Sequence, residues 1–361
     1  MNKNLIDSHI HYDISGSASK IKDALDLTGC KACCLQSLIT KRKINQNFDM
    51  FYAKKLLGDK VYINGALDSY LYLHQDKMNE MPNYIERMMA CGMDGIKMLE
   101  GKPTARKRFP IPNFDEAIFD PTFKFLEENQ INVTWHVNDP EEFWNEKLVP
   151  DWARKSGWFY ADGTYVNNID QYNQIENLLK KHPKLRITFA HFYFLSNNLE
   201  YLSKLFDTYP NIAVDITPGI ELFTNLSANI ENAKSFFNKY SDRIIYGTDI
   251  SIDSDERDEL NTDDAITRKN LCHEFLSKDK TVLLGNPDSL LGSDDLYLNC
   301  LNLDDEKIER IEYKNFLNRY QENHKLNKDL ILKEIDIHKT KLKELNLDIT
   351  YLAKIEDAFK N

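Results

Sequence analysis

The sequence predicts an α/β protein built on a (β/α)8 TIM barrel, and three observations support this prediction. Eight short apolar runs rich in β-branched residues alternate along the chain with amphipathic stretches of helical spacing. Strands that alternate with helices form parallel βαβ units, and eight such units are what the barrel requires. The length of 361 residues suits one large barrel or two ordinary domains. A doubly wound open sheet is the alternative that this pattern leaves open.

The expected strands and helices can be bounded from the apolar pattern. The strands are NLIDSHI (4–10), KACCLQSL (31–38), KVYINGAL (60–67), DGIKML (94–99), INVTWHV (131–137), LRITFAHF (185–192), NIAVDIT (211–217) and RIIYGTD (243–249). The helices lie within 17–29, 83–92, 120–129, 169–182, 197–209 and 230–240, where apolar residues recur at intervals of three and four. Gly29 and Gly92 are typical residues for the end of a helix.

The longest connection, residues 138–184, separates the fifth strand from the sixth and is rich in aromatic side chains. It holds three of the four tryptophans, Trp144, Trp152 and Trp158. In a barrel this β5–α5 loop lies at the C-terminal mouth, where active sites form, so it could be a lid or an aromatic wall. We expect Trp144 and Trp158 to contact substrate there. The alternative is a loop with a small core of its own.

The barrel pattern ends near residue 321, which divides the chain into a barrel domain, 1–321, and a charged helical extension, 322–361. Apolar residues recur in the extension at helical spacing and predict a face that packs on the barrel exterior or in self-association. These residues are Ile331, Ile335, Leu342, Leu345, Leu352, Ile355 and Phe359.

Composition restricts the class of partner and the compartment. The chain has 46 Lys and Arg against 57 Asp and Glu, a formal charge of −11, which argues against nucleic acid or an anionic membrane as the main partner. No secretory leader precedes the first strand, and no apolar run is long enough to cross a membrane. We therefore expect a cytoplasmic protein. The cysteines of CKACC (30–34) have no second paired motif, so we interpret them as buried reduced thiols.

Two histidines, His9 and His11, end the first apolar run. Side chains at i and i+2 of a strand point to the same face, with Cα atoms roughly 6–7 Å apart. The two imidazoles are therefore close enough to bind one divalent ion. From this stretch alone, a pair of hydrogen-bonded or exposed histidines accounts for the pattern equally well.

Other chemically active side chains end further predicted strands and favour the metal interpretation. His136 ends the fifth strand, His191 the sixth and Asp249 the eighth. If the barrel closes, these side chains converge with His9 and His11 at one mouth. Nitrogen donors and a carboxylate around an open position are typical of a catalytic metal site. Asp249 could then ligate the ion and accept a proton, and His191 could stabilise charge or act as an acid.

Lys97, at the end of the fourth strand, leaves several roles open. It could bind an anionic substrate, be carboxylated to bridge two metals, or pair with an acid. The following EGKPTARKRFP (100–110) adds four further cations. A basic loop at the mouth hints at a carboxylate or phosphate on the substrate, although a solvated surface loop accounts for it equally well.

The ordered motifs DSHIH, His136, His191 and GTD resemble the amidohydrolase superfamily. More closely, residues 5–320 look like the amidohydrolase-2 branch, which includes aminocarboxymuconate semialdehyde decarboxylase and related hydrolases and lactonases. GMDGIKML (92–99), the stretch 119–139 and IEYKNFLNRY (311–320) add to the resemblance. It implies metal binding by His9, His11, His136 and Asp249, with one zinc or manganese ion. His191 would be the histidine of the sixth strand, which either contacts a metal ligand or acts in catalysis.

The first functional hypothesis is a metal-dependent hydrolase that cleaves a C–O or C–N bond of a small polar or anionic substrate, such as a lactone, ester or amide. Its alternative is a metal-dependent nonoxidative decarboxylase of an aromatic or unsaturated acid. A TatD-like nuclease, a phosphoesterase of the polymerase-and-histidinol-phosphatase type and a non-catalytic binding barrel are further alternatives. We expect one divalent ion, zinc or else manganese, and a homodimer.

Overall fold

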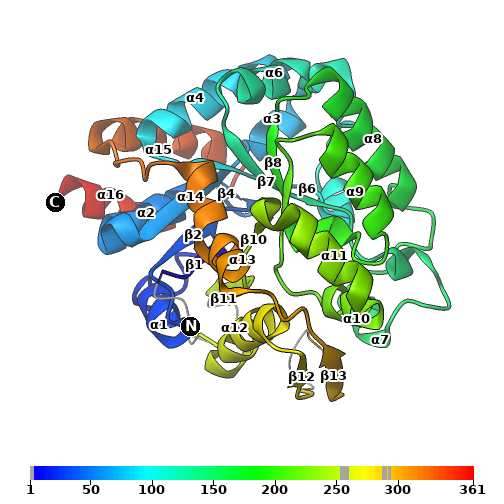
Figure 1. The fold of residues 1–361 in the computed structure, drawn as a ribbon. Coiled ribbons are helices and arrows are strands. Elements are labelled where there is room, and N and C mark those ends of the chain that lie inside the picture. Colours follow the sequence, from blue (N-terminus) through cyan, green and yellow to red (C-terminus); the bar gives the residue numbers. More distant parts are fainter. Residues whose placement is uncertain (1–3, 253–259, 287–290, 292–293) are drawn as a thin grey trace.

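A computed structural model of the chain, describing residues 4–252, 260–286, 291 and 294–361, has a barrel of parallel strands surrounded by helices (Figure 1). Within these residues the main sheet has nine strands in the order β10-β9-β8-β7-β6-β5-β2-β1-β11, and each pairing is parallel. The strands are β1 (Ile6–Tyr12), β2 (Ala32–Gln36), β5 (Val61–Ala66), β6 (Gly95–Gly101), β7 (Asn132–Val137), β8 (Arg186–Phe189), β9 (Ala213–Asp215), β10 (Ile244–Ile245) and β11 (Ile250–Ile252).

The barrel closes through an interrupted eighth strand. β10 pairs with β9, whereas β11 pairs with β1. The backbone between β10 and β11 also bonds to β1, because Ser8 N–H donates to Tyr246 O at 3.1 Å and Asp249 N–H donates to His9 O at 2.9 Å. The predicted TIM barrel is therefore confirmed, with its last strand in two pieces.

Helices surround this sheet and agree with the predicted stretches. They include α1 (Ser19–Thr28), α4 (Met81–Cys91), α6 (Asp120–Glu128), α8 (Asn168–Lys181), α9 (Leu199–Thr208) and α11 (Ile230–Tyr240). Gly29 and Gly92 end α1 and α4 with φ of 74° and 115°, the left-handed conformation that glycine adopts without strain. Among the described helices, none is both long and apolar enough to span a membrane.

Several elements lie outside the predicted pattern. They are the pair β3 (Ile39–Thr40) and β4 (Ile44–Asn45), α2 (Asn47–Leu57), α5 (Pro103–Arg108), α10 (Ile220–Ala228), α12 (Thr262–Ser277) and the antiparallel pair β12 (Lys280–Leu283) and β13 (Leu296–Asn299). Helix α2 contacts β5 and belongs to the outer layer. Most residues of α2 are buried, so its apolar residues show a weaker helical period than those of α1 or α4. The sequence pattern therefore does not predict this helix.

The strands are buried on both faces, which is what helices on the outside of a parallel sheet require. All five residues of β2 are buried, including Cys33 and Cys34. The six cysteines are buried free thiols, in agreement with the interpretation of CKACC.

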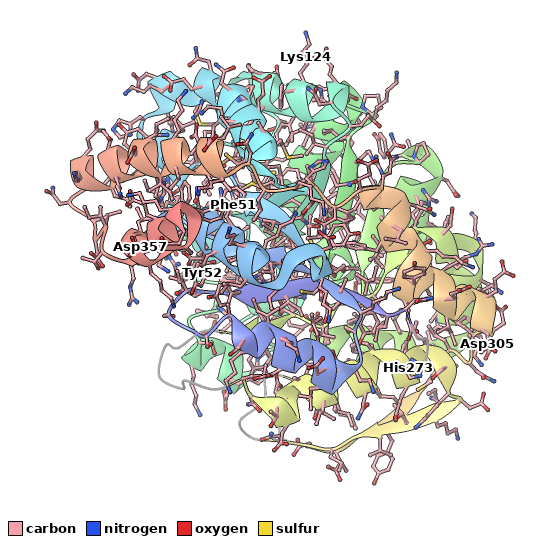
Figure 2. The ribbon with its side chains drawn as sticks, turned by 90° about the vertical axis from the view of Figure 1, so that its left-hand side faces the viewer. Phe51, Tyr52, Lys124, His273, Asp305 and Asp357 are labelled. Atoms are coloured by element: carbon pink, nitrogen blue, oxygen red, sulfur yellow. The ribbon has the colours of Figure 1, made fainter. Side chains whose placement is uncertain are left out.

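The C-terminal extension forms two helices, α15 (Lys328–Glu344) and α16 (Tyr351–Lys360), that pack on the barrel exterior beside α4 and α2 (Figures 1 and 2). Ile331, Ile335 and Phe359 are buried in the main hydrophobic core. Tyr70 O–H also donates to Glu344 at 2.6 Å. The extension is thus held by its predicted apolar face, while self-association stays a prediction.

A buried histidine of α15 makes the stability of the chain depend on pH. The His338 ring lies 4.8 Å from the ring of Phe48, its Nε2 is 3.1 Å from the Tyr351 hydroxyl, and burial lowers its pKa to about 3. Because the unfolded pKa is near 6.5, stability is intact above that pH and falls as the pH drops towards 3. We expect wild type to lose about 2 kcal/mol more than His338→Gln between pH 7.5 and pH 5, measured by urea unfolding. Equal losses in both proteins would mean that the pKa of His338 is not lowered by folding.

Candidate metal and catalytic site

A cavity of about 340 Å³ opens at the C-terminal ends of the barrel strands. It brings together His11 of β1, Lys97 of β6, His136 of β7, Asp249 from the segment between β10 and β11, and His191 from the segment after β8. His9 lies beneath them, with its ring centroid 5.1 Å from that of His11. The predicted convergence of these residues at the barrel mouth therefore occurs.

Within the cavity, three residues form a group that could bind a metal ion. One donor atom each from His9, His11 and Asp249 lies within 4.8 Å of the other two. Asp249 Oδ1 is 3.2 Å from His11 Nε2 and 3.7 Å from His9 Nε2. Two imidazoles and one carboxylate form a donor set that suits zinc or manganese.

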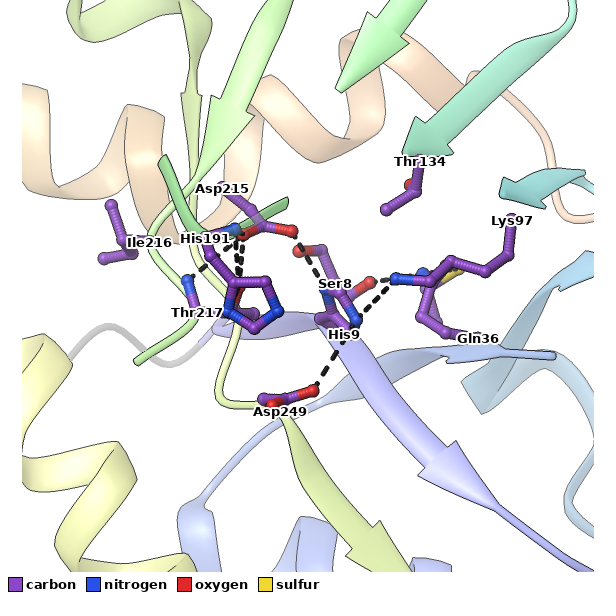
Figure 3. A network of polar contacts seen from close by, with 12 residues as sticks. Ser8, His9, Gln36, Lys97, Thr134, His191, Asp215, Ile216, Thr217 and Asp249 are labelled. Atoms are coloured by element: carbon purple, nitrogen blue, oxygen red, sulfur yellow. Dashed lines mark hydrogen bonds and ion pairs between the residues drawn. The ribbon is translucent and has the colours of Figure 1, made fainter. Parts of the chain in front are cut away.

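The hydrogen bonds of the two histidines orient them for this role, and Figure 3 shows the contact of His9 with Asp215. His9 Nδ1 lies 2.9 Å from the Asp215 carboxylate, and His11 Nδ1 lies 2.9 Å from the backbone oxygen of Gln36. Both partners only accept, so each Nδ1 carries the proton and each Nε2 keeps its lone pair. Such an outer partner is what metal-binding imidazoles usually have. The residues present thus fit a divalent ion.

Asp215 also places a negative charge behind the site. Burial alone would raise its pKa, but the adjacent His9 and their hydrogen bond outweigh burial and lower the pKa to about 2. Burial, with the nearby Lys97 charge, lowers the pKa of His9 to about 4. A neutral imidazole next to an ionised carboxylate is the state that metal binding requires.

The backbone around Asp7 explains why His9 and Asp249 meet. The buried Asp7 carboxylate accepts hydrogen bonds from His9 N–H and Thr248 N–H, each at 3.1 Å, and from the Thr248 hydroxyl. Gly247 permits the close approach, because a Cβ there would lie 2.8 Å from Thr217 Cγ2 and 3.0 Å from His9 Cβ. The aspartate of DSHIH and the glycine of YGTD therefore join β1 to the segment that carries Asp249.

Lys97 occupies the centre of the site. Its Nζ lies 2.9 Å from His9 Nε2, to which it donates in this structure (Figure 3). Burial lowers the pKa of Lys97 to about 8, so the neutral amine is within reach near physiological pH. An ion bound by His9 would displace this contact and leave the amine to face the cavity. The predicted roles of Lys97, in substrate binding or as a carboxylated bridge, stay predictions.

His191 lies in an unusual backbone segment. The strand ends at Phe189, and residues 191–194 all have positive φ, with His191 at 53°. Its backbone N–H donates to Asp215 at 2.8 Å, and its Nδ1 is 3.2 Å from the Thr217 hydroxyl. Asp249 also has a positive φ, 59°. Non-glycine residues rarely adopt this conformation, and it concentrates at functional sites.

His136 lines the cavity but bonds to a different partner. Its Nε2 lies 3.1 Å from Asp139 Oδ1, and Asp139 also accepts from Lys102 at 2.7 Å and from the Tyr160 hydroxyl at 2.6 Å. His136 is outside the group formed by His9, His11 and Asp249. Its ring is 4.9 Å from that of His191. Ligation by His136 stays a prediction that requires its ring to leave Asp139.

The aromatic loop forms both an aromatic wall of the cavity and a small core of its own, the two alternatives that the sequence left open. Phe143, Trp152 and Trp158 line the cavity. They also belong to a separate small core together with Tyr160. Trp144 lies in this small core, where its Nε1–H donates to Val166 O at 3.0 Å and its ring packs on Tyr160, and it is not among the cavity-lining residues. Trp158 is therefore placed for the predicted substrate contact, and Trp152 stands where Trp144 was expected.

Sequence reasoning did not single out four charged residues of the site, Asp139, Asp215, Glu221 and Arg268. Asp215 ends β9 and Asp139 follows β7, so the rule that selected the histidines applies to both. Arg268 comes from α12 and Glu221 from α10, where nothing in the local pattern distinguishes them from surface residues. Both line the cavity, and burial raises the pKa of Glu221 to about 7.

Comparison with known proteins agrees with the fold. The chain matches no protein-family model and no curated protein sequence. Among solved structures it is similar to an uncharacterised TIM-barrel protein, Bb4693, from Bordetella bronchiseptica, with 12% identity and a TM-score of 0.54 over 88% of this chain and 100% of that one. A candidate amidohydrolase from Staphylococcus aureus matches at 13% identity with a TM-score of 0.54 over the same shares.

A third similar structure is a dihydroxybenzoic acid decarboxylase from Polaromonas sp. JS666, solved with bound manganese and the inhibitor 2-nitroresorcinol. It shares 13% identity and a TM-score of 0.50 over 89% of this chain and 97% of that one. These likenesses establish the TIM-barrel fold of the present chain. One of these proteins is an amidohydrolase-type protein and another is a decarboxylase.

Proposed function

We propose that the chain is a metal-dependent hydrolase of the amidohydrolase-2 type that cleaves a C–O or C–N bond in a small polar or anionic substrate such as a lactone, ester or amide. The observation that carries this proposal is the group formed by His9 Nε2, His11 Nε2 and Asp249 Oδ1, with both Nδ1 protons fixed by acceptors. The order of motifs along the chain and the fold shared with an amidohydrolase-type structure support it.

The residues of the site divide the chemistry between them. A divalent ion held by His9, His11 and Asp249 would polarise a substrate oxygen and lower the pKa of a water molecule. His11, 3.2 Å away, and the other nearby histidines hold the pKa of Asp249 well below its usual range despite burial, so this carboxylate is ionised and can accept a proton. Burial lowers the pKa of His191 to about 3, so its imidazole is neutral. The Thr217 hydroxyl donates to Asp215 and accepts from His191 Nδ1–H, which leaves Nε2 of His191 with a lone pair that can accept a hydrogen bond from water or a substrate hydroxyl.

The cavity wall suggests a substrate with a flat apolar part and a polar or anionic group. Trp152, Trp158 and Phe143 provide an aromatic face. Lys102 Nζ lies 4.7 Å from the centroid of the Trp158 ring, beside that aromatic face. The buried Lys97 lines the same cavity. This pairing of aromatic surface with cations also favours the second candidate, nonoxidative decarboxylation of an aromatic acid. The decarboxylases of the branch that the motifs resemble tend to carry an insertion soon after the first strand, whereas here β1 and α1 are joined by residues 13–18 alone, so hydrolysis is our first choice.

Metal content tests the common premise of both reactions. We expect about one zinc or manganese ion per purified chain by inductively coupled plasma mass spectrometry, and loss of that ion in His9→Ala/His11→Ala. The control is His74→Ala, since His74 is not among the residues that line the cavity and its Nδ1 bonds to Tyr70 O. A chain that binds no ion after growth with zinc and manganese would overturn the proposal.

The reaction itself is decided with the metal-loaded protein. We expect turnover in a panel of lactones, esters and amides, without release of carbon dioxide. Release of carbon dioxide from an aromatic carboxylate, with no turnover in the hydrolysis panel, would replace the hydrolase assignment by the decarboxylase. Two ions per chain would instead make Lys97 a carboxylated bridge.

A further inference from the structure

A second cavity, of about 610 Å³, lies where the C-terminal extension meets the barrel. Three segments line it: residues 13–15 after β1, residues 40–43 and 46 around the β3–β4 hairpin, and Tyr351 and Lys354 of α16, with Arg108 from the end of α5. It shares no lining residue with the catalytic cavity. Its volume is within the range of small-molecule binding sites.

The wall of this cavity is strongly basic in a chain whose net charge is −11. Its charged lining residues are Lys41, Arg42, Lys43, Arg108 and Lys354, against one carboxylate, Asp13. Asp13 is already paired with a cation, because Lys43 Nζ lies 2.7 Å from its Oδ2, and Gln46 Nε2 donates to the same oxygen at 3.0 Å. Lys43 is shared with the buried Asp49 at 2.8 Å.

Three of the cations have no acidic partner in the described part of the chain. Lys41 and Arg108 are exposed and form no ion pair there. Lys354 is also without a carboxylate, and its Nζ lies 5.1 Å from the Tyr52 ring centroid. Cations brought together in a concave site without counter-charges repel one another, and a bound anion relieves that repulsion.

Lys43 connects the parts of the chain that form the cavity wall. Lys43 Nζ lies 4.9 Å from the Tyr351 ring centroid, which ties the hairpin to α16 next to its pairs with Asp13 and Asp49. The extension therefore contributes Tyr351 and Lys354 to a wall whose remaining cations come from barrel loops. This gives the 322–361 extension a role beyond covering the outer helices.

We propose that this basic cavity is a binding site for a small phosphorylated ligand, separate from the catalytic cavity. A phosphate group carries up to two negative charges and offers three acceptor oxygens, which suits one guanidinium and several ammonium groups better than a single carboxylate does. The proposal does not depend on the reaction catalysed at the barrel mouth.

Isothermal titration of the full-length, metal-loaded chain with inorganic phosphate tests the site. We expect binding that weakens with added salt and falls by about tenfold in Arg108→Gln/Lys354→Gln, because two charge-assisted contacts are lost. The matched control, Lys333→Gln/Lys343→Gln, removes two exposed cations of α15 and should bind phosphate as wild type does. Both variants change exposed side chains, and thermal unfolding checks that each is folded.

Two further titrations distinguish the basic cavity from the catalytic cavity, and phosphate from a simple carboxylate. In Asp249→Asn the affinity for phosphate should be unchanged, whereas a loss would place the anion at the catalytic site and overturn the proposal. Acetate should bind more weakly than phosphate, and equal affinity would overturn the preference for phosphate. An absence of phosphate binding, or equal affinity in Arg108→Gln/Lys354→Gln and its control, would also overturn it.

Discussion

Asp249→Asn is expected to lower kcat/KM by about a thousandfold or more, because the residue would serve both as a metal ligand and as the proton acceptor. Asparagine keeps the shape of the side chain, but it cannot accept a proton at neutral pH and binds a metal more weakly. The contact of His11 Nε2 with Oδ1, 3.2 Å, would also lose its charge. The measurement is steady-state turnover of the substrate identified in the panel, together with metal content.

The control for this variant is Asp207→Asn. Asp207 is an exposed carboxylate of α9 that pairs with Lys239 at 2.9 Å, and its loss removes the same charge far from the site. We expect Asp207→Asn to keep wild-type turnover and metal content. If Asp249→Asn turned over substrate at the wild-type rate, Asp249 would be neither a metal ligand nor the proton acceptor. A thermal unfolding temperature close to that of wild type excludes misfolding as the cause.

The parts of the site that the sequence predicts are those carried by regular strands. His9, His11 and Lys97 lie in β1 and β6, where alternation of side chains and the rule that active sites form at the C-terminal ends of strands place them correctly. His136, at the end of β7, reaches the same mouth. The alternation of strands and helices predicts a parallel sheet but also permits an open one, and it is the pairing of β11 with β1 in the structure that closes the barrel.

The remaining parts depend on contacts between residues distant in sequence. That His136 turns to Asp139 rather than to His9 and His11 depends on the second partner of Asp139, Lys102, which local pattern does not reveal. The left-handed segment after β8 is held by Asp215 and Thr217, on the neighbouring strand and just beyond it. Likewise, the choice of Trp152 over Trp144 as a cavity residue depends on how the loop folds on Tyr160.

A buried ion pair outside the site has the largest expected effect on stability. Lys54 of α2 is 4% exposed, and its Nζ lies 2.7 Å from Asp94 Oδ2 and donates to Gly92 O at 3.1 Å. Asp94 also accepts from the backbone N–H groups of Ile63 and His324, each at 2.7 Å. One carboxylate thus connects α2, the start of β5, the turn before β6 and the segment that leads to the C-terminal extension.

Lys54→Met keeps most of the side-chain volume but leaves the Asp94 charge buried without its cation. Breaking one side of a buried pair typically costs 3–5 kcal/mol, and we expect a loss of about 3 kcal/mol in the free energy of unfolding at pH 8, measured with urea. Lys55→Met, the next residue on the same helix and exposed, is the control and should change stability by less than about 0.5 kcal/mol.

The pH dependence of this loss tests its electrostatic origin. Burial raises the pKa of Asp94 even with Lys54 present, and removal of Lys54 would raise it further. With a raised folded pKa, the carboxyl group of the variant takes up a proton as the pH falls, and the penalty for an unpaired charge disappears. The difference in stability between wild type and Lys54→Met should therefore shrink from pH 8 to pH 5. A difference that stays constant over this range would mean that lost packing, rather than the buried charge, destabilises the variant.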